Sequence, residues 1–169
     1  MKPFQQYLTE ERISGPHGIF VKLTPTVDSI LALVERFPEM NCDDPHCTLI
    51  YTHDSFHDIQ VPEIARTGRW KGIGKELEWF EGATKIGFVI LHVESPEIRA
   101  LQKKFFEAGF PERSDFDEYK PHVSLIFPAP KAEWDFYIQH NNHVLQHRPL
   151  ELEFFYGGYQ ILEENTPET

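Results

Sequence analysis

The sequence has few cysteines, few basic side chains and no long apolar run. Cys42 and Cys47 are the only two cysteines among 169 residues, too few for a disulfide framework, which favours a reducing compartment. The N-terminus lacks the apolar core of a signal peptide, and no apolar stretch is long enough to cross a bilayer. These absences predict a cytoplasmic protein without a membrane partner.

The shortage of basic side chains limits the ligands that the protein is expected to bind. There are 16 lysines and arginines against 27 acidic residues, which gives a formal net charge of −11. A general nucleic-acid binder presents a basic face, and an acidic protein repels a long polyanion. We therefore expect no long nucleic acid as a partner, but a small phosphate-bearing ligand in a locally basic cleft remains compatible with this charge.

Hydrophobic residues make up 40% of the chain and aromatic residues 14%, a composition typical of a folded globular protein. The length suits one domain with a sizeable core, so we predict a single domain over residues 1–169. Within it, Phe4 to Arg12 has the apolar spacing of a short helix. Residues 1–14 are therefore expected to form an N-terminal helix or a leader segment.

Two short stretches share one pattern and organise the rest of the analysis. They are His46-Cys47-Thr48-Leu49 and His122-Val123-Ser124-Leu125, each preceded by proline and followed by an aliphatic run. Apolar, β-branched and aromatic residues dominate both runs, which predicts two strands. Residues two apart in a strand point to the same face. Each strand should therefore present one imidazole and one hydroxyl on a single face.

A duplicated imidazole and hydroxyl pair has a specific chemical use. Phosphodiester cleavage by internal transfer needs a base for the attacking hydroxyl and an acid for the leaving oxygen. Two histidines can divide these roles near neutral pH. The hydroxyls of Thr48 and Ser124 can donate hydrogen bonds to the phosphoryl oxygens. We therefore expect His46, Thr48, His122 and Ser124 to be catalytic, with no metal and no cofactor, although the pattern does not say which histidine is the base.

This motif pair resembles the two-histidine (2H) phosphoesterase superfamily. The resemblance implies an α+β fold with two pseudo-symmetric antiparallel-sheet lobes, flanked by helices around a central cleft, each lobe supplying one motif. It implies a hydrolase, and the size, charge and opening of the chain favour the phage anti-CBASS type. Enzymes of that type cleave the cyclic di- and trinucleotide signals of bacterial immunity, which would place this protein in the host cytoplasm.

The resemblance also suggests aromatic side chains that stack on the bases of the substrate. The segment from His17 to Thr24 alternates as a central strand, with Phe20 on its less aliphatic face. Lys120 shares the face of His122 by strand parity, and Tyr159 belongs to a closing strand. We expect Phe20, Lys120 and Tyr159 to bind substrate, although aromatic residues at such positions more often belong to a core. A solvated lysine at a strand edge is an equal alternative for Lys120.

Two other functions share the same four residues or the same ligand. An RNA 2′,3′-cyclic phosphodiesterase or 2′-5′ RNA ligase-like enzyme would act on RNA ends and should carry a basic rim, which the net charge of −11 disfavours. A cyclic-nucleotide sponge would bind the signal without cutting it. The sequence does not distinguish base specificity, ring size or oligomeric state, and it indicates no protein partner.

The remaining elements follow from local patterns. A helix should begin after Thr26 and run to Arg36, and a second should begin after Ser95. In the first helix, the residues expected to pack inward are Ile30, Leu31, Leu33 and Val34. A third should run from Lys131 to about Asn141. The other expectations concern β-structure: a hairpin over 61–81 that turns at 71–75, a strand over 84–93 buried on both faces, and two closing strands, 151–155 and 159–162, separated by Gly157-Gly158. His53 and His57 have a metal-like spacing, but a surface loop is favoured there.

The first residues also suggest an alternative to a docking helix. The opening is similar to the capsid-targeting leaders of large tailed phages, which are cut after a Leu/Ile-x-Glu tripeptide. Leu8-Thr9-Glu10 fits that tripeptide. An amphipathic helix that stays attached to the domain is the favoured interpretation.

Overall fold

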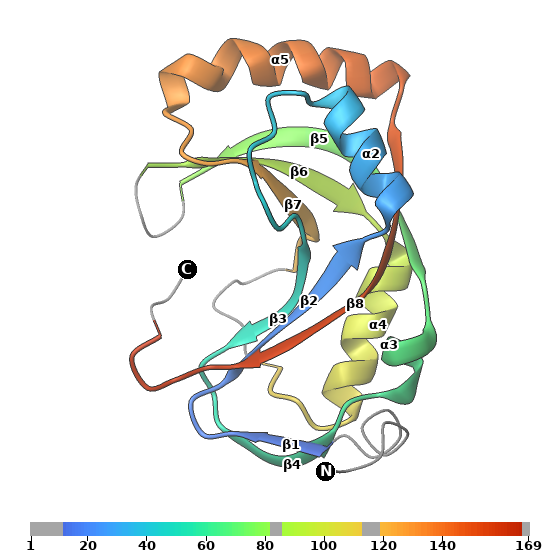
Figure 1. Ribbon diagram of the computed structural model, residues 1–169, viewed down its shortest axis with the longest axis vertical. Helices are drawn as coiled ribbons and strands as arrows, with labels where there is room; N and C mark the ends of the chain where they lie inside the picture. The colour runs from blue at the N-terminus through green and yellow to red at the C-terminus, as the bar shows by residue number, and fades with distance from the viewer. Residues whose placement is uncertain (1–11, 82–85, 113–118, 167–169) are drawn as a thin grey trace.

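The computed structural model describes residues 12–81, 86–112 and 119–166 (Figure 1). The described part is α+β, as the sequence predicts. Its elements, in chain order, are β1 (Arg12–Gly15), β2 (Ile19–Pro25), α2 (Val27–Arg36), β3 (Cys47–Thr52), β4 (Phe56–Gln60), α3 (Glu63–Thr67), β5 (Trp70–Phe80), β6 (Phe88–Glu94), α4 (Pro96–Glu107), β7 (His122–Ile126), α5 (Lys131–His147) and β8 (Leu150–Ile161).

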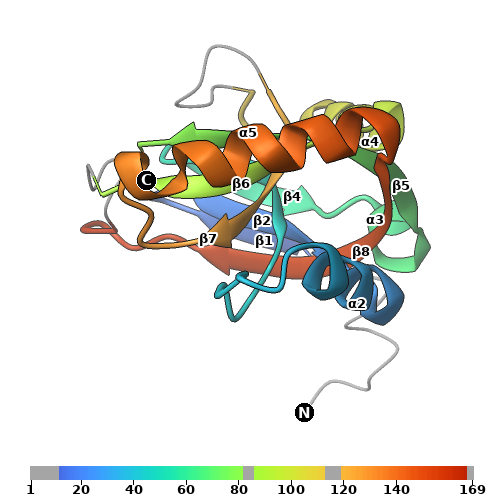
Figure 2. The same ribbon diagram turned by 90° about the horizontal axis from the view of Figure 1, so that it is seen from above.

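Six strands form one closed antiparallel ring in the order β2-β3-β7-β6-β5-β8, and β1 pairs with β4 separately. In Figure 1, α5 crosses one end of the molecule and the β1–β4 pair lies at the opposite end. Seen from above, in Figure 2, α5 lies over the β5 and β6 side of the ring. Six of the described strands therefore join in a single ring, and a division into two pseudo-symmetric lobes stays a prediction.

Strand β2 shows how alternation along a strand builds the core. In β2, Ile19, Val21 and Leu23 are at most 1% exposed, whereas the residues between them are half-buried. Cys47 in β3 and Val123 in β7 are both fully buried and lie directly opposite each other. This pair fixes which face of the two motif strands belongs to the core, because successive side chains alternate between faces.

The hairpin expected over residues 61–81 is wrong. Residues 63–67 form the short helix α3, and residues 70–80 form the single long strand β5. Gly72 and Gly74 lie inside that strand because their neighbours approach closely. A Cβ atom at Gly72 would meet Val93 Cγ1 at 2.4 Å, and one at Gly74 would meet Leu91 Cδ2 at 2.8 Å. These glycines make room for side chains of β6 and do not mark a turn.

The two closing strands are also one. β8 runs from Leu150 to Ile161 without interruption, so the expected break at Gly157-Gly158 is wrong. The two glycines coincide with a shift of register against β2, between Lys22 and Leu23. Gly158 has a φ of 104°, which L side chains rarely adopt. The glycine pair therefore accommodates a bulge within a continuous strand.

Helix α2 begins after Thr26 as expected, because the Thr26 side chain accepts a hydrogen bond from the amide of Ser29. Leu33 is fully buried beneath the helix. Leu31 and Val34, in contrast, are 62% and 48% exposed, so the expectation that they pack inward is wrong. Since residues on one helix face recur every three or four positions, the face that carries Leu33 excludes them.

Strand β6 begins four residues later than expected, at Phe88, and helix α5 continues to His147 instead of ending near Asn141. The strand is also not buried on both faces, because His92 is partly exposed. A strand with one buried face and one accessible face can present side chains to a cleft.

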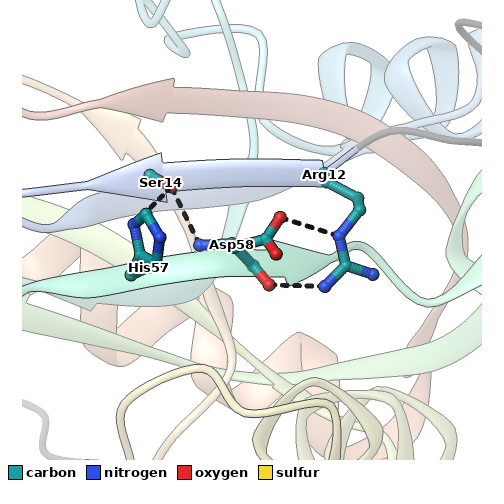
Figure 3. A network of polar contacts seen from close by, with 4 residues as sticks. All are labelled: Arg12, Ser14, His57 and Asp58. Atoms are coloured by element: carbon teal, nitrogen blue, oxygen red, sulfur yellow. Dashed lines mark hydrogen bonds and ion pairs between the residues drawn. The ribbon is translucent and has the colours of Figure 1, made fainter.

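The proposed N-terminal helix or leader falls mostly on residues 1–11, outside the described part of the chain. From Arg12 onward the chain is strand β1, not helix. Figure 3 shows how this strand is held: Arg12 Nε donates to Asp58 Oδ1 at 2.8 Å, and the amide of Asp58 donates to Ser14 Oγ at 2.8 Å. His57 Nδ1 lies 3.3 Å from the Ser14 hydroxyl. His57 belongs to strand β4, so the surface loop expected there is wrong at this residue.

Ser95 caps the N-terminus of helix α4, as the sequence predicts. Ser95 is 1% exposed; its hydroxyl donates to the carbonyl of Lys71 at 2.6 Å and accepts from the amide of Ile98 at 3.0 Å. Ser95→Ala removes both bonds and leaves the partly buried carbonyl of Lys71 without this donor, so we expect a loss of about 1–2 kcal/mol. Urea unfolding measures this, with the exposed Ser55→Ala as the control. Equal stability of the two variants would contradict the capping role.

Candidate active site

His46 and His122 are oriented in the same way. His46 Nδ1 lies 2.9 Å from the carbonyl oxygen of Asp44, and His122 Nδ1 lies 2.9 Å from that of Lys120. A carbonyl only accepts hydrogen bonds, so each Nδ1 carries the proton. In the neutral form of both rings, Nε2 is therefore the basic atom. This arrangement gives two imidazoles that are each prepared to take or give a proton at Nε2.

The pairing of β3 with β7 brings the two motifs together on one face. Cys47 and Val123 are opposite each other and point into the core. The flanking residues consequently point to the other face, where antiparallel pairing sets His46 across from Ser124 and Thr48 across from His122. Thr48 and His122 line the same cavity, of about 230 Å³. The four residues predicted to be catalytic therefore lie on one non-core face of adjacent strands.

The surroundings of His122 favour its neutral form. Burial lowers the pKa of His122 below its usual value, and the positive charges that His92 and His46 can carry lower it further. The carbonyl of Lys120 and the carboxylate of Glu78 oppose this shift. His122 is therefore suited to accept a proton near neutral pH, and its charge interaction with His46 agrees with their shared face.

Phe20 lies beside the first motif. Its ring centroid is 5.4 Å from that of His46 and 5.9 Å from that of Tyr51. On the same strand face, Lys22 Nζ forms an ion pair of 2.7 Å with Asp44 Oδ2, and Lys22 lowers the pKa of that carboxyl. Lys22 thus contacts the residue whose carbonyl orients His46.

The two other expected substrate-binding residues have different positions. Lys120 lines the same cavity as His122, and its carbonyl holds the His122 ring. Tyr159 pairs with Val21 and packs against the core, whereas Gln160 pairs with Phe20. The structure therefore does not bring Tyr159 to the face of Phe20. The bulge at Gly157-Gly158 shifts by one residue which side chains of β8 face the core. The alternation of residue types in the sequence does not show this shift.

Sequence analysis missed a second group of residues in the cleft. His92 lies directly opposite His122 in the pairing of β6 with β7, and its Nε2 is 2.5 Å from Glu78 Oε2. Glu78, Phe80 and His92 line the same cavity as His122. The alternation of Glu76 and Glu78 with apolar residues was a usable signal for a polar strand face. The expected hairpin over residues 61–81 does not use this signal.

An aromatic row extends from His122 along this face. The ring centroids of Phe80 and His122 are 6.4 Å apart, and those of Phe80 and Phe88 are 6.5 Å apart. Phe88 in turn stacks on Phe127 at 4.5 Å, and Phe127 is 40% exposed. The row therefore connects the site with the surface, and stacked aromatic rings are suitable contacts for nucleobases.

Residues 12–81, 86–112 and 119–166 contain no group of three or more His, Cys, Asp or Glu side chains placed to hold a metal ion. No helix within the same ranges is long and apolar enough to cross a membrane.

The fold and the site define an α+β protein with two histidine and hydroxyl pairs on one strand face, next to a cavity. The sequence model of the family described as "Anti-CBASS protein Acb1" matches residues 21–152, which include both motifs. The chain belongs to this anti-CBASS family. No curated protein matches the sequence.

Proposed function

We propose that this protein is a metal-independent phosphodiesterase of the 2H type, which cleaves the 3′-5′ linkages of cyclic di- and trinucleotide immune signals. The observation that supports it best is the common face of His46, Thr48, His122 and Ser124. Its anti-CBASS family supports a ligand of the cyclic oligonucleotide class. The proposed place of action is the cytoplasm of the infected cell.

The geometry suggests a role for each histidine. His122, which burial keeps neutral, takes the proton of the ribose 2′-OH at Nε2. The 2′ oxygen attacks the adjacent phosphorus in line, and the bond from phosphorus to the 5′ oxygen breaks. Protonated His46 gives its Nε2 proton to that departing oxygen. The product is a linear oligonucleotide with a 2′,3′-cyclic phosphate and a free 5′-OH, and the two histidines have exchanged protonation states.

Thr48 and Ser124 are proposed to donate hydrogen bonds to the non-bridging phosphoryl oxygens, where negative charge increases in the transition state. Thr48→Val keeps the shape of the side chain and removes the hydroxyl. We expect kcat to fall about 10- to 100-fold with less change in KM. Thr67→Val, at an exposed position of α3, is the matched control. A Thr48→Val enzyme as fast as this control would remove Thr48 from the reaction.

The function is tested with a panel of substrates, with and without EDTA. The panel holds cyclic di- and trinucleotides and a short RNA with a 2′,3′-cyclic phosphate end, and chromatography resolves the products. We expect cleavage of the cyclic oligonucleotides that EDTA does not inhibit. Cleavage of the RNA end alone would instead indicate an RNA-processing enzyme, and tight binding without products would indicate a sponge. Inhibition by EDTA would contradict the metal-independent mechanism.

A further inference from the structure

A third imidazole and a carboxylate lie beside His122, and the mechanism above leaves them unused. They are His92 on β6 and Glu78 on β5, with Nε2 and Oε2 only 2.5 Å apart. His92 is the direct cross-strand neighbour of His122, and their ring centroids are 6.4 Å apart in an edge-to-face arrangement. The three side chains line one cavity.

We propose that Glu78 and His92 form a charge pair that controls whether His122 carries a proton, and so prepares His122 for its part in the reaction. The catalytic consequence rests on the proposed function, whereas the charge pair itself does not. Glu78 and His92 are positioning residues in this proposal, since they act on substrate only through His122.

The hydrogen bond fixes the orientation of the pair. A carboxylate only accepts, so His92 Nε2 carries a proton and donates it to Glu78. The His92 ring is 21% exposed and the Glu78 side chain 56%, so the pair lies between the protein and the solvent of the cleft, where charges are only partly screened. His92 is consequently held at a fixed separation from His122.

The two members of the pair act on His122 in opposite directions. A positive charge on His92 opposes a proton on His122, whereas the negative charge of Glu78 favours it, and both effects contribute to the pKa of His122. The other ionisable groups around His122, from the elements that pack around it or line its cavity, are His46, Tyr51, Glu112, Tyr119 and Lys120. Glu78 differs from them because it forms the hydrogen bond to the His92 ring.

Removal of the positive member gives the first test. His92→Gln keeps an amide N–H that can donate to Glu78 but carries no charge. The repulsion is lost while the carboxylate remains, so the pKa of His122 should rise. An NMR titration of the His122 ring in the free protein is expected to shift upward by about half a pH unit. An unchanged or lowered pKa of His122 would overturn the proposal.

Removal of both members separates the role of Glu78. The double variant Glu78→Gln with His92→Gln differs from the single His92→Gln only in the carboxylate charge. We expect its His122 to titrate at a lower pH than in the single variant, because the favourable negative charge is lost. If the double and single variants titrate alike, Glu78 does not belong to the pair and the proposal fails.

A matched control lies on the same two strands. Lys75 of β5 and Glu94 of β6 form an exposed ion pair, and neither lines the cavity of His122. Lys75→Gln therefore removes a positive charge from the same ladder and should leave the His122 titration unchanged. A shift as large as that in His92→Gln would show a general charge effect and contradict a specific pair.

The activity profile connects the pair to catalysis and can fail separately. With His122 as the base, kcat/KM falls at low pH as His122 becomes protonated. The midpoint of this acidic limb should therefore move to higher pH in His92→Gln, in parallel with the NMR titration. If NMR shows the shift but the wild type cleaves no cyclic oligonucleotide, the charge pair stands and the proposed function fails. If the wild type is active and the NMR titration does not move, the charge pair fails alone.

Discussion

His46→Ala and His122→Ala are each expected to reduce turnover of a cyclic dinucleotide by about three orders of magnitude, because each removes one of the two proton transfers. His122→Ala removes the proposed base, and His46→Ala removes the proposed acid. The two losses should not add in the double variant, since either one already stops the concerted step. Single-turnover kinetics, with the enzyme in saturating excess over the substrate, measures the effect on the chemical step.

The histidine variants need two controls. His140→Ala changes an exposed histidine on helix α5 and should leave turnover unchanged. Circular dichroism and binding of uncleaved ligand should show that the folds of His46→Ala and His122→Ala are intact. Near-complete activity in either catalytic variant would refute the paired acid and base assignment, whatever the family relationship.

Phe154→Ala is expected to destabilise the protein by about 3–5 kcal/mol, the usual cost of truncating a fully buried phenylalanine. Phe154 is 0% exposed and lies on β8 where this strand pairs with Pro25 of β2 and with Trp70 of β5. Its removal leaves a cavity where three strands of the ring meet. Urea unfolding monitored by tryptophan fluorescence gives the free energy of unfolding.

The same substitution at an exposed site controls for the loss of an aromatic ring. Phe136 lies on α5 and is 80% exposed, so Phe136→Ala should change the free energy of unfolding by less than about 0.5 kcal/mol. If Phe154→Ala and Phe136→Ala had the same free energy of unfolding, the packing of Phe154 between β2 and β5 would not stabilise the closed ring.

The motif strands and the α+β class were predictable because they depend on short-range patterns. A proline, a histidine, a hydroxyl two residues later and an aliphatic run predict a strand with one polar face, and the structure has such strands at Cys47–Thr52 and His122–Ile126. The helix start at Ser95 was predictable for the same reason, since a cap acts within one turn.

Features that depend on distant neighbours were not predictable. Gly72 and Gly74 resemble turn residues in sequence, and only the side chains of Val93 and Leu91 on the adjacent strand explain them. The place of His92 in the cleft likewise depends on the register of β6 against β7. A single sequence does not contain that register, so the Glu78 and His92 pair could not be found before the strands were placed.

Strand β8 has a consequence for how the protein is made. A ribosome synthesises β2 early and β8 late, yet the two lie side by side over seven residue pairs. The ring therefore cannot close until residues 150–161 have left the ribosome, and such distant pairings slow folding. Until then both histidine motifs already exist in the nascent chain, but the sheet that aligns them is incomplete. We expect the proposed cleavage of cyclic oligonucleotides to arise only after β8 has paired with β2.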